Sequence, residues 1–363
     1  MLRSIGKTCF AAVYSLTHGA YGRSNRSKSR CAAPFIICYH RVVEDFSRSA
    51  LTAIPSMLIS ASMLERHIDW LARQFKIVSL DEIGMHLAKG RFNRPPAAIT
   101  FDDGYADVYH NALPLLKRKG VPAAVFVVTD LVGTGRPQVF DRLYLLLKIL
   151  QSRGLPVAQT VEKAMRSVDA GAEDLDFLRN TQDEPFRIMT LLLKRLSHHR
   201  VGLVMTALEQ SSFVDHATLE ECAPLTWDMI QTMHQEGITI GSHTKSHTLL
   251  TSESLETAMQ QLVESKQALE SRLKSPVKHF AYPDGRFNSP VVQAVNSAGY
   301  RFAYGICRRT DQTFPLLTIS RKVLWERACI NAWGSFSPSI MKCHAEAAFD
   351  SKHRCEHDHF PLV

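Results

Sequence analysis

Two short segments of this 363-residue chain combine the residue types of a hydrolytic metal site. One reads Thr-Phe-Asp-Asp-Gly-Tyr and contains Asp102 and Asp103; the other reads Gly-Ser-His-Thr-Lys-Ser-His and contains His243 and His247. One of two adjacent aspartates can bind a divalent cation while the other accepts a proton from water, and two neutral imidazoles complete the ligand set. A cation also offsets the repulsion between adjacent carboxylates. The two segments therefore predict a metal-dependent hydrolase.

Each segment follows a run that is typical of a buried strand. Residues 97–101 are mostly apolar, and Gly104 lets the chain turn away, which places both aspartates at the carboxyl end of that strand. Residues 237–241 are also strand-like, and if the turn after them is helical, the i,i+4 spacing puts both imidazoles on one face. Residues 280–285 repeat the strand-then-turn form. Barrel enzymes keep their chemistry at this end of their strands.

Each piece also has a plainer explanation when it is taken alone. An Asp-Asp-Gly sequence is most often a turn, and most His-x3-His pairs bind no metal. The coincidence of three such pieces, each directly after a strand-like run, favours one shared site over separate surface loops.

The motifs resemble those of the polysaccharide deacetylases of carbohydrate esterase family 4, over residues 35–120 and 225–321. The sequence of residues 39–42, Tyr-His-Arg-Val, is similar to the opening strand of one branch of that family. The resemblance implies an α/β fold, a distorted (β/α)7 barrel with a zinc-type ion, and removal of N-acetyl groups from amino sugars. It also implies that Asp102 is the base and that the metal ligands are Asp103, His243 and His247.

The chain departs from the family pattern in two motifs. In the third motif Ala281 stands where the family has arginine and Asp284 where it has tyrosine, so the clamp that would orient Asp102 is missing locally. Another arginine would have to substitute for it. In the last motif Arg321 stands where the family has the histidine that acts as general acid. We interpret these departures as marks of a subfamily that retains activity.

Three further residues are candidates for the site. The turn that contains Asp284 could contribute a backbone N–H to a tetrahedral oxyanion, and Asp284 is therefore grouped with the catalytic residues. His40 follows the first expected strand and is a candidate for contacting the substrate and protonating the leaving amine, with a hydrogen-bonded structural histidine as the alternative. Tyr282 either walls the sugar site or packs in the core.

The expected organisation is one enlarged catalytic domain with added segments. Residues 131–224 lose strand-like alternation and read as a helical insertion that either caps the substrate site or only covers the side of the barrel. The deacetylase barrel is assigned to residues 31–130 and 225–330, preceded by a basic amphipathic leader over 1–30. Residues 331–363 form a tail that contains Cys343, His344, His353, Cys355, His357 and His359, which we interpret as polar and disordered rather than as a metal site.

The charge distribution bears on partners and location. Residues 1–30 contain six lysines and arginines and no acidic residue, within a net charge of +8 for the chain. With one apolar helical face, this leader predicts a peripheral anchor on an anionic membrane, and a signal peptide is the rival explanation. The eight cysteines show no paired spacing, which favours a reducing compartment. We therefore expect a cytoplasmic protein or one peripheral on the cytoplasmic membrane, with export by a weak signal peptide as the other outcome.

The sequence thus predicts a metal-dependent hydrolase, a polysaccharide deacetylase that uses a divalent cation such as Zn²⁺ on an N-acetylated glycan. Two other classes remain: an amide hydrolase that acts on a non-sugar substrate, and a glycan-binding module without catalytic activity. The presence of Asp102 favours an enzyme. Nucleic-acid binding is disfavoured, because the excess positive charge lies in the leader and is not interleaved with aromatic residues.

Overall fold

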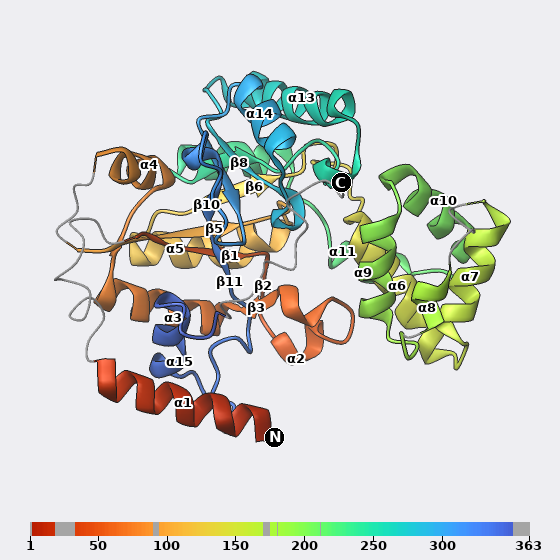
Figure 1. Ribbon diagram of the computed structural model, residues 1–363, viewed down its shortest axis with the longest axis horizontal. Coiled ribbons are helices and arrows are strands. Elements are labelled where there is room, and N and C mark those ends of the chain that lie inside the picture. Colours follow the sequence, from red (N-terminus) through yellow and green to blue (C-terminus); the bar gives the residue numbers. More distant parts are fainter. Residues whose placement is uncertain are drawn as a thin grey trace.

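The computed structural model describes residues 2–18, 33–89, 94–169, 175–179, 181–210 and 212–350. Its centre is a parallel β-sheet with the strand order β10-β9-β8-β7-β6-β5-β1-β11 (Figure 1). These strands are β1 (Phe35–Tyr39), β5 (Pro96–Phe101), β6 (Ala124–Val127), β7 (Thr239–Ser242), β8 (His279–Ala281), β9 (Phe302–Gly305), β10 (Ile319–Ser320) and β11 (Lys322–Val323). The short β4 (Lys76–Ile77) pairs with the beginning of β5.

One short segment closes the sheet into a barrel. β10 pairs with β9 and β11 pairs with β1, although only Arg321 separates the two strands along the chain. The pair therefore occupies one place in the ring, and the described residues form seven strand positions. The prediction of a distorted (β/α)7 barrel is confirmed.

The alternation of side chains along β5 decides which residues face the inside of the barrel. Ala98 belongs to the cluster of apolar side chains that fills the interior, whereas Ile99 packs with the helices outside. Because strand side chains alternate, Thr100 and Asp102 share the interior face with Ala98. Phe126 fills much of this interior, and a Cβ at Gly241 would lie 2.6 Å from its ring, which explains the glycine in β7.

Helices cover the barrel on its outer side. They are α3 (Ala61–Gln74), α4 (Leu80–Lys89), α5 (Leu113–Lys119), α12 (Trp227–Gln235), α13 (Leu255–Leu273) and α14 (Ser289–Ser297). Thr226 caps the N-terminus of α12, because its hydroxyl accepts a hydrogen bond from the Met229 N–H at 3.2 Å. After β1, a parallel pair of strands, β2 (Arg41–Val43) and β3 (Leu58–Ser60), flanks α2 (Phe46–Ser49).

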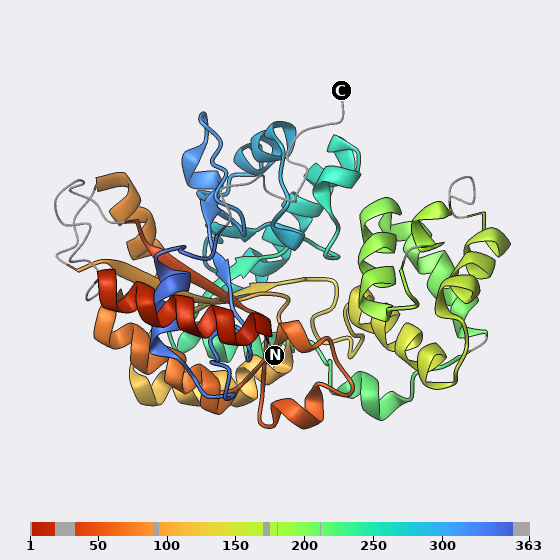
Figure 2. The same cartoon turned by 60° about the horizontal axis from the view of Figure 1, so that its bottom comes forward.

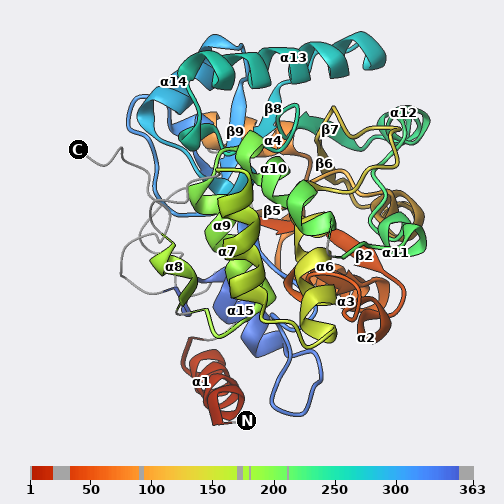
Figure 3. The same cartoon turned by 90° about the vertical axis from the view of Figure 1, so that its right-hand side faces the viewer.

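A bundle of helices interrupts the barrel between β6 and β7. It comprises α6 (Val139–Ser152), α7 (Val157–Ser167), α8 (Asp176–Arg179), α9 (Pro185–Arg195), α10 (His198–Glu209) and α11 (His216–Glu220). The bundle has its own apolar core, to which the barrel contributes Tyr105 and Ile54. It lies beside the barrel in Figure 1, and Figure 3 shows its helices in front of the strands.

A helix lies within the expected leader, and a second helix lies where a polar tail was expected. α1 (Leu2–His18) packs against α15 (Pro338–Ala345), and Ile340, Met341 and Cys343 of α15 belong to the main core. Residues 338–345 are therefore part of the folded domain, which corrects the expectation of a polar tail there. His353, Cys355, His357 and His359 lie outside the described residues. In the described part of the chain, no helix has the length and apolar character that crossing a membrane requires.

Candidate metal and catalytic site

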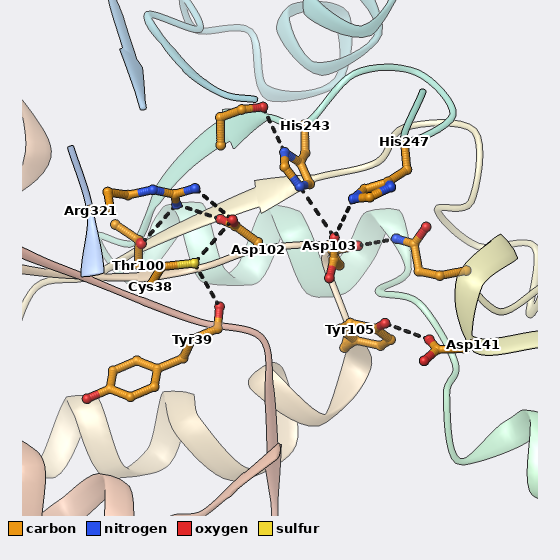
Figure 4. Close-up of polar contacts among 12 residues, drawn as sticks. Cys38, Tyr39, Thr100, Asp102, Asp103, Tyr105, Asp141, His243, His247 and Arg321 are labelled. Atoms are coloured by element: carbon orange, nitrogen blue, oxygen red, sulfur yellow. Dashed lines mark hydrogen bonds and ion pairs between the residues drawn. The ribbon is translucent and has the colours of Figure 1, made fainter. Parts of the chain in front are cut away.

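Asp103, His243 and His247 converge at the carboxyl ends of β5 and β7 (Figure 4). Nε2 of His243 lies 3.4 Å and Nε2 of His247 3.2 Å from Oδ1 of Asp103. The ligand atoms of the three side chains lie within 4.8 Å of one another. The structure therefore brings together the three residues that the sequence predicts as metal ligands.

The backbone reaches this geometry through left-handed residues. Asp103 and Gly104 both have φ of 70°, which turns the chain sharply after β5. The second segment is a turn rather than the helix considered above, with φ of 68° at Thr244 and 56° at His247. Gln261 of α13 supports this turn, because its Oε1 accepts the N–H groups of residues 245 and 246 at 3.1 and 3.0 Å. The two imidazoles meet through this turn, with ring centroids 4.9 Å apart.

The donor set fits a divalent cation. Both carboxylate oxygens of Asp103 are buried, and neither has a hydrogen bond of good geometry. Nδ1 of His243 lies 2.7 Å from the carbonyl oxygen of Ala281, so that nitrogen carries the proton and the lone pair of Nε2 is left for a cation. In tetrahedral zinc sites with bonds of about 2.1 Å, neighbouring ligand atoms lie about 3.4 Å apart. The separations in this site match that spacing.

Asp102 is not part of the predicted ligand set, and its carboxylate is held by Arg321. Two guanidinium nitrogens of Arg321 donate to the two carboxylate oxygens of Asp102, each at 2.7 Å. The Arg321 side chain is fully buried, donates to Thr100 Oγ1 at 3.1 Å and lies over the Phe126 ring at 5.2 Å. The Cys38 thiol also donates to Asp102, at 3.2 Å. Arg321 is thus the arginine that replaces the missing clamp, and it comes from the segment that closes the barrel.

This ion pair decides the protonation state of Asp102. Burial alone would raise the pKa of Asp102, but the Arg321 guanidinium and the nearby imidazole of His243 outweigh it, so the pKa lies below its usual range. Burial also opposes the charge on Asp103, whose pKa is nevertheless lowered by His243 and His247. Both carboxylates are therefore ionised at neutral pH, one held by a guanidinium and the other by two imidazoles.

His40 lies next to this pair. One of its ring nitrogens, the thiol sulfur of Cys38 and a carboxylate oxygen of Asp102 lie within 4.8 Å of one another. Nδ1 of His40 is buried and has no hydrogen-bond partner among the described residues. Burial lowers the pKa of His40, although Asp103 and Asp102 act in the opposite direction. The structure therefore places His40 at the site as a neutral imidazole.

The structure does not join the other two candidates to the ligand cluster. Tyr282 is fully buried, and its hydroxyl donates to the carbonyl of Leu317 at 2.8 Å, so it is a core residue and not a wall of a sugar site. The Asp284 carboxylate accepts from Arg286 at 2.8 Å. In the turn η4 (Pro283–Gly285), proline has no N–H and the Gly285 N–H donates to the carbonyl of Tyr282. The expected oxyanion contact is thereby restricted to the N–H of Asp284 and stays a prediction.

The helical insertion directly contacts residues of the predicted metal site. Gln138, which is buried at the start of α6, donates through Nε2 to the backbone carbonyl of Asp103 at 3.1 Å. The Phe140 ring packs edge-on against His247, with centroids 5.0 Å apart. Asp141 accepts a hydrogen bond from the Tyr105 hydroxyl at 2.6 Å (Figure 4). The N-cap residue and the first turn of α6 thus support both segments of the site, and the sequence did not indicate these particular residues.

Gln138→Ala should weaken metal binding about tenfold to a hundredfold, the range for residues that hold metal ligands in place. The change removes the donor that holds the Asp103 turn. Gln151→Ala is a matched control, because Gln151 makes the same kind of bond, to the carbonyl of Asp183 at 3.2 Å, inside the insertion. Competition with a chromogenic chelator measures both affinities. Equal affinities in the two variants would show that Gln138 does not support the ligands.

Sequence comparisons place this chain in a known family. The chain matches the family described as polysaccharide deacetylase over residues 89–164 and 185–303, more than half of its length, and it belongs to that family. It is 35% identical over 86 residues to a poly-beta-1,6-N-acetyl-D-glucosamine N-deacetylase of Staphylococcus aureus, which is 23% of this chain and 30% of that protein. A protein of the same name from Staphylococcus epidermidis is 32% identical over 118 residues, 30% of this chain and 40% of the relative. The chain thus spans less than half the length of these relatives.

Two solved structures share the fold. The Streptococcus pyogenes deacetylase PplD in complex with acetate superposes with a TM-score of 0.54 at 16% identity, covering 87% of this chain and 99% of that one. IcaB from Ammonifex degensii superposes with a TM-score of 0.51 at 16% identity, covering 87% of this chain and 97% of that chain. At such low identity these likenesses support the barrel fold alone.

Proposed function

We propose that this chain is a metal-dependent N-deacetylase that removes acetyl groups from an amino-sugar glycan. The observation that carries the proposal is a buried base, Asp102, held by Arg321 beside three converging ligands. Retention of this tethered carboxylate favours an enzyme over a glycan-binding module, because binding alone has no use for a base. The names of the curated relatives support an N-acetylated amino sugar as the substrate.

Each residue of the site has a separate task in this reaction. A divalent cation held by Asp103, His243 and His247, most simply Zn²⁺, would polarise the amide carbonyl and increase the acidity of water at the site. Asp102 accepts the proton of the attacking water. Arg321 holds both oxygens of Asp102, fixes its orientation and keeps it deprotonated.

Cleavage of the amide also requires a proton for the departing amine. We assign its delivery to His40, which would take up the proton that Asp102 accepted from water and pass it to the amine nitrogen, because it lies beside Asp102 and its Nδ1 has no hydrogen-bond partner among the described residues. The alternative is that Asp102 returns the proton that it accepted. Arg321 cannot replace the general acid of the family's last motif, because its guanidinium does not lose a proton in proteins and both of its terminal nitrogens hold Asp102.

The zinc-loaded chain should deacetylate an N-acetylated glucosamine polymer or oligomer. Mass spectrometry of the glycan after incubation detects each event as the mass decrease of an acetyl group replaced by hydrogen. The control is the same incubation with enzyme stripped by a chelator, which should be inactive until zinc is restored. Activity on simple acetamides with none on any amino sugar would assign the chain to amide hydrolases of other substrates, and glycan binding without any mass change would make it a binding module.

A further inference from the structure

The helix α1 has two different faces, and one of them is fixed to the domain. Lys7 donates through Nζ to the carbonyl of Ala328 at 2.6 Å, and the Thr8 hydroxyl accepts from the N–H of Ala332 at 3.0 Å. Ala11 is fully buried on this side. These contacts join α1 to the segment that leads into α15. The helix therefore has a set orientation on the protein.

The opposite face of α1 carries apolar side chains that the described residues leave largely exposed. Ile5 is 43% exposed, Val13 60% and Leu16 85%. Together with the exposed Cys9, these positions are separated by three or four residues, so they share one face of the helix. We call Ile5, Cys9, Val13 and Leu16 the free face. Figure 2 shows α1 on the outside of the domain, in front of the helices that cover the barrel.

The charge of the N-terminal sequence indicates what this face meets. Residues 1–30 contain six lysines and arginines and no aspartate or glutamate. Such a segment is attracted to anionic surfaces, and its apolar face gains free energy when it leaves water. A second copy of the chain would bring two equally basic segments together, which like-charge repulsion disfavours. An amphipathic helix with these properties lies in the plane of a membrane interface.

We infer that the free face of α1 docks this protein on an anionic lipid bilayer. Insertion of Val13 and Leu16 among the acyl chains supplies the apolar part of the affinity, and the net positive charge of the N-terminal sequence supplies the electrostatic part. Because the other face of α1 is bound to the region of α15, docking places the whole catalytic domain in one orientation at the membrane surface. The inference does not depend on the substrate of the enzyme.

Co-sedimentation of the full-length chain with vesicles tests this inference. Vesicles that contain phosphatidylglycerol should bind the protein, vesicles of phosphatidylcholine alone should bind it much more weakly, and raised salt should weaken the binding. The double variant Val13→Gln, Leu16→Gln removes apolar contact without changing charge, and we expect it to bind at least about tenfold more weakly. The double variant Ser4→Gln, Thr17→Gln changes two exposed polar positions of α1 outside the free face, and it should bind like the native chain.

Three results would overturn the inference. One is an intact chain that ignores phosphatidylglycerol vesicles. A second is a dimer in solution that the free-face double variant abolishes, because the occupant of the face would then be another copy. A third is mature protein, isolated from its host, that begins beyond about Ala20, as a cleaved signal peptide would leave it. N-terminal sequencing detects that case, and deacetylase assays on a soluble glycan should give equal rates for both double variants.

Discussion

Asp102→Asn should lower turnover at least about a hundredfold while the enzyme keeps its metal, because the change removes a positioned base and no ligand. The asparagine side chain keeps one carbonyl oxygen for Arg321, so the fold should persist. Asp103→Asn is the matched variant one position along the chain. It replaces the anionic ligand of the predicted site, so metal and activity should be lost together. Metal content by plasma mass spectrometry and turnover on an acetylated glycan separate the two cases.

The contrast between these neighbours tests the division of labour directly. A metal-loaded Asp102→Asn enzyme with normal turnover would remove Asp102 from the mechanism. Undiminished metal affinity in Asp103→Asn, or in His243→Ala or His247→Ala, would refute that ligand assignment. Melting temperatures in the presence of metal must accompany each measurement, so that loss of folding is not mistaken for loss of a ligand.

The sequence was sufficient to predict the residues of the site that come directly after strands. Residues 97–101 were recognisable as a buried strand, and Gly104 marked where it ends, so the place of Asp102 and Asp103 could be predicted from local pattern. The alternation of side chains also explains why Asp102 points into the barrel whereas the next residue, Asp103, does not. The two aspartates meet the histidine segment because parallel strands end at the same edge of a sheet, as β5, β6 and β7 do.

Contacts between distant segments could not be predicted in the same way. Arg321 lies 219 residues from Asp102 along the chain and reaches it only because residues 319–323 close the ring. The sequence showed that an arginine was missing and could not say which one replaced it. Gln138 is similar, because it contacts the backbone carbonyl of Asp103 and no sequence motif marks Gln138 itself.

The structure decides two local questions that the sequence left open. The His-x3-His spacing matches one helical turn, yet left-handed φ angles at Thr244 and His247 produce the same meeting of rings in an irregular turn. An aromatic residue just after a strand suits a sugar site or a core equally well, and the burial of Tyr282 among Phe280 and Phe287 decides for the core. Tertiary packing, which a single sequence does not display, chose between the alternatives in both cases.

Arg321→Met should both destabilise the protein and shift its pH dependence. The variant leaves Asp102 buried without its counter-ion, which costs about 3–5 kcal/mol when one partner of a buried pair is removed. Asp102 acts as a base only when it is deprotonated. With Arg321 gone, burial raises the pKa of Asp102, so the acidic limb of the kcat/KM profile should move to higher pH, and raising the pH should restore part of the activity.

The double variant Asp102→Asn, Arg321→Met identifies the cause of the instability. If an unpaired buried charge is responsible, neutralising Asp102 should recover most of the lost free energy of unfolding, since replacing both partners of a buried pair is often nearly neutral. The native pair stabilises the fold above the unfolded-state pKa of about 3.9, and that contribution falls as the pH drops towards the lowered native pKa. The native chain and Arg321→Met should therefore converge in stability in acid. Should Arg321→Met fold too poorly to assay, Arg321→Lys keeps the charge without the two-pronged contact, and an unchanged pH profile in that variant would show that charge alone, not the paired geometry, sets the state of Asp102.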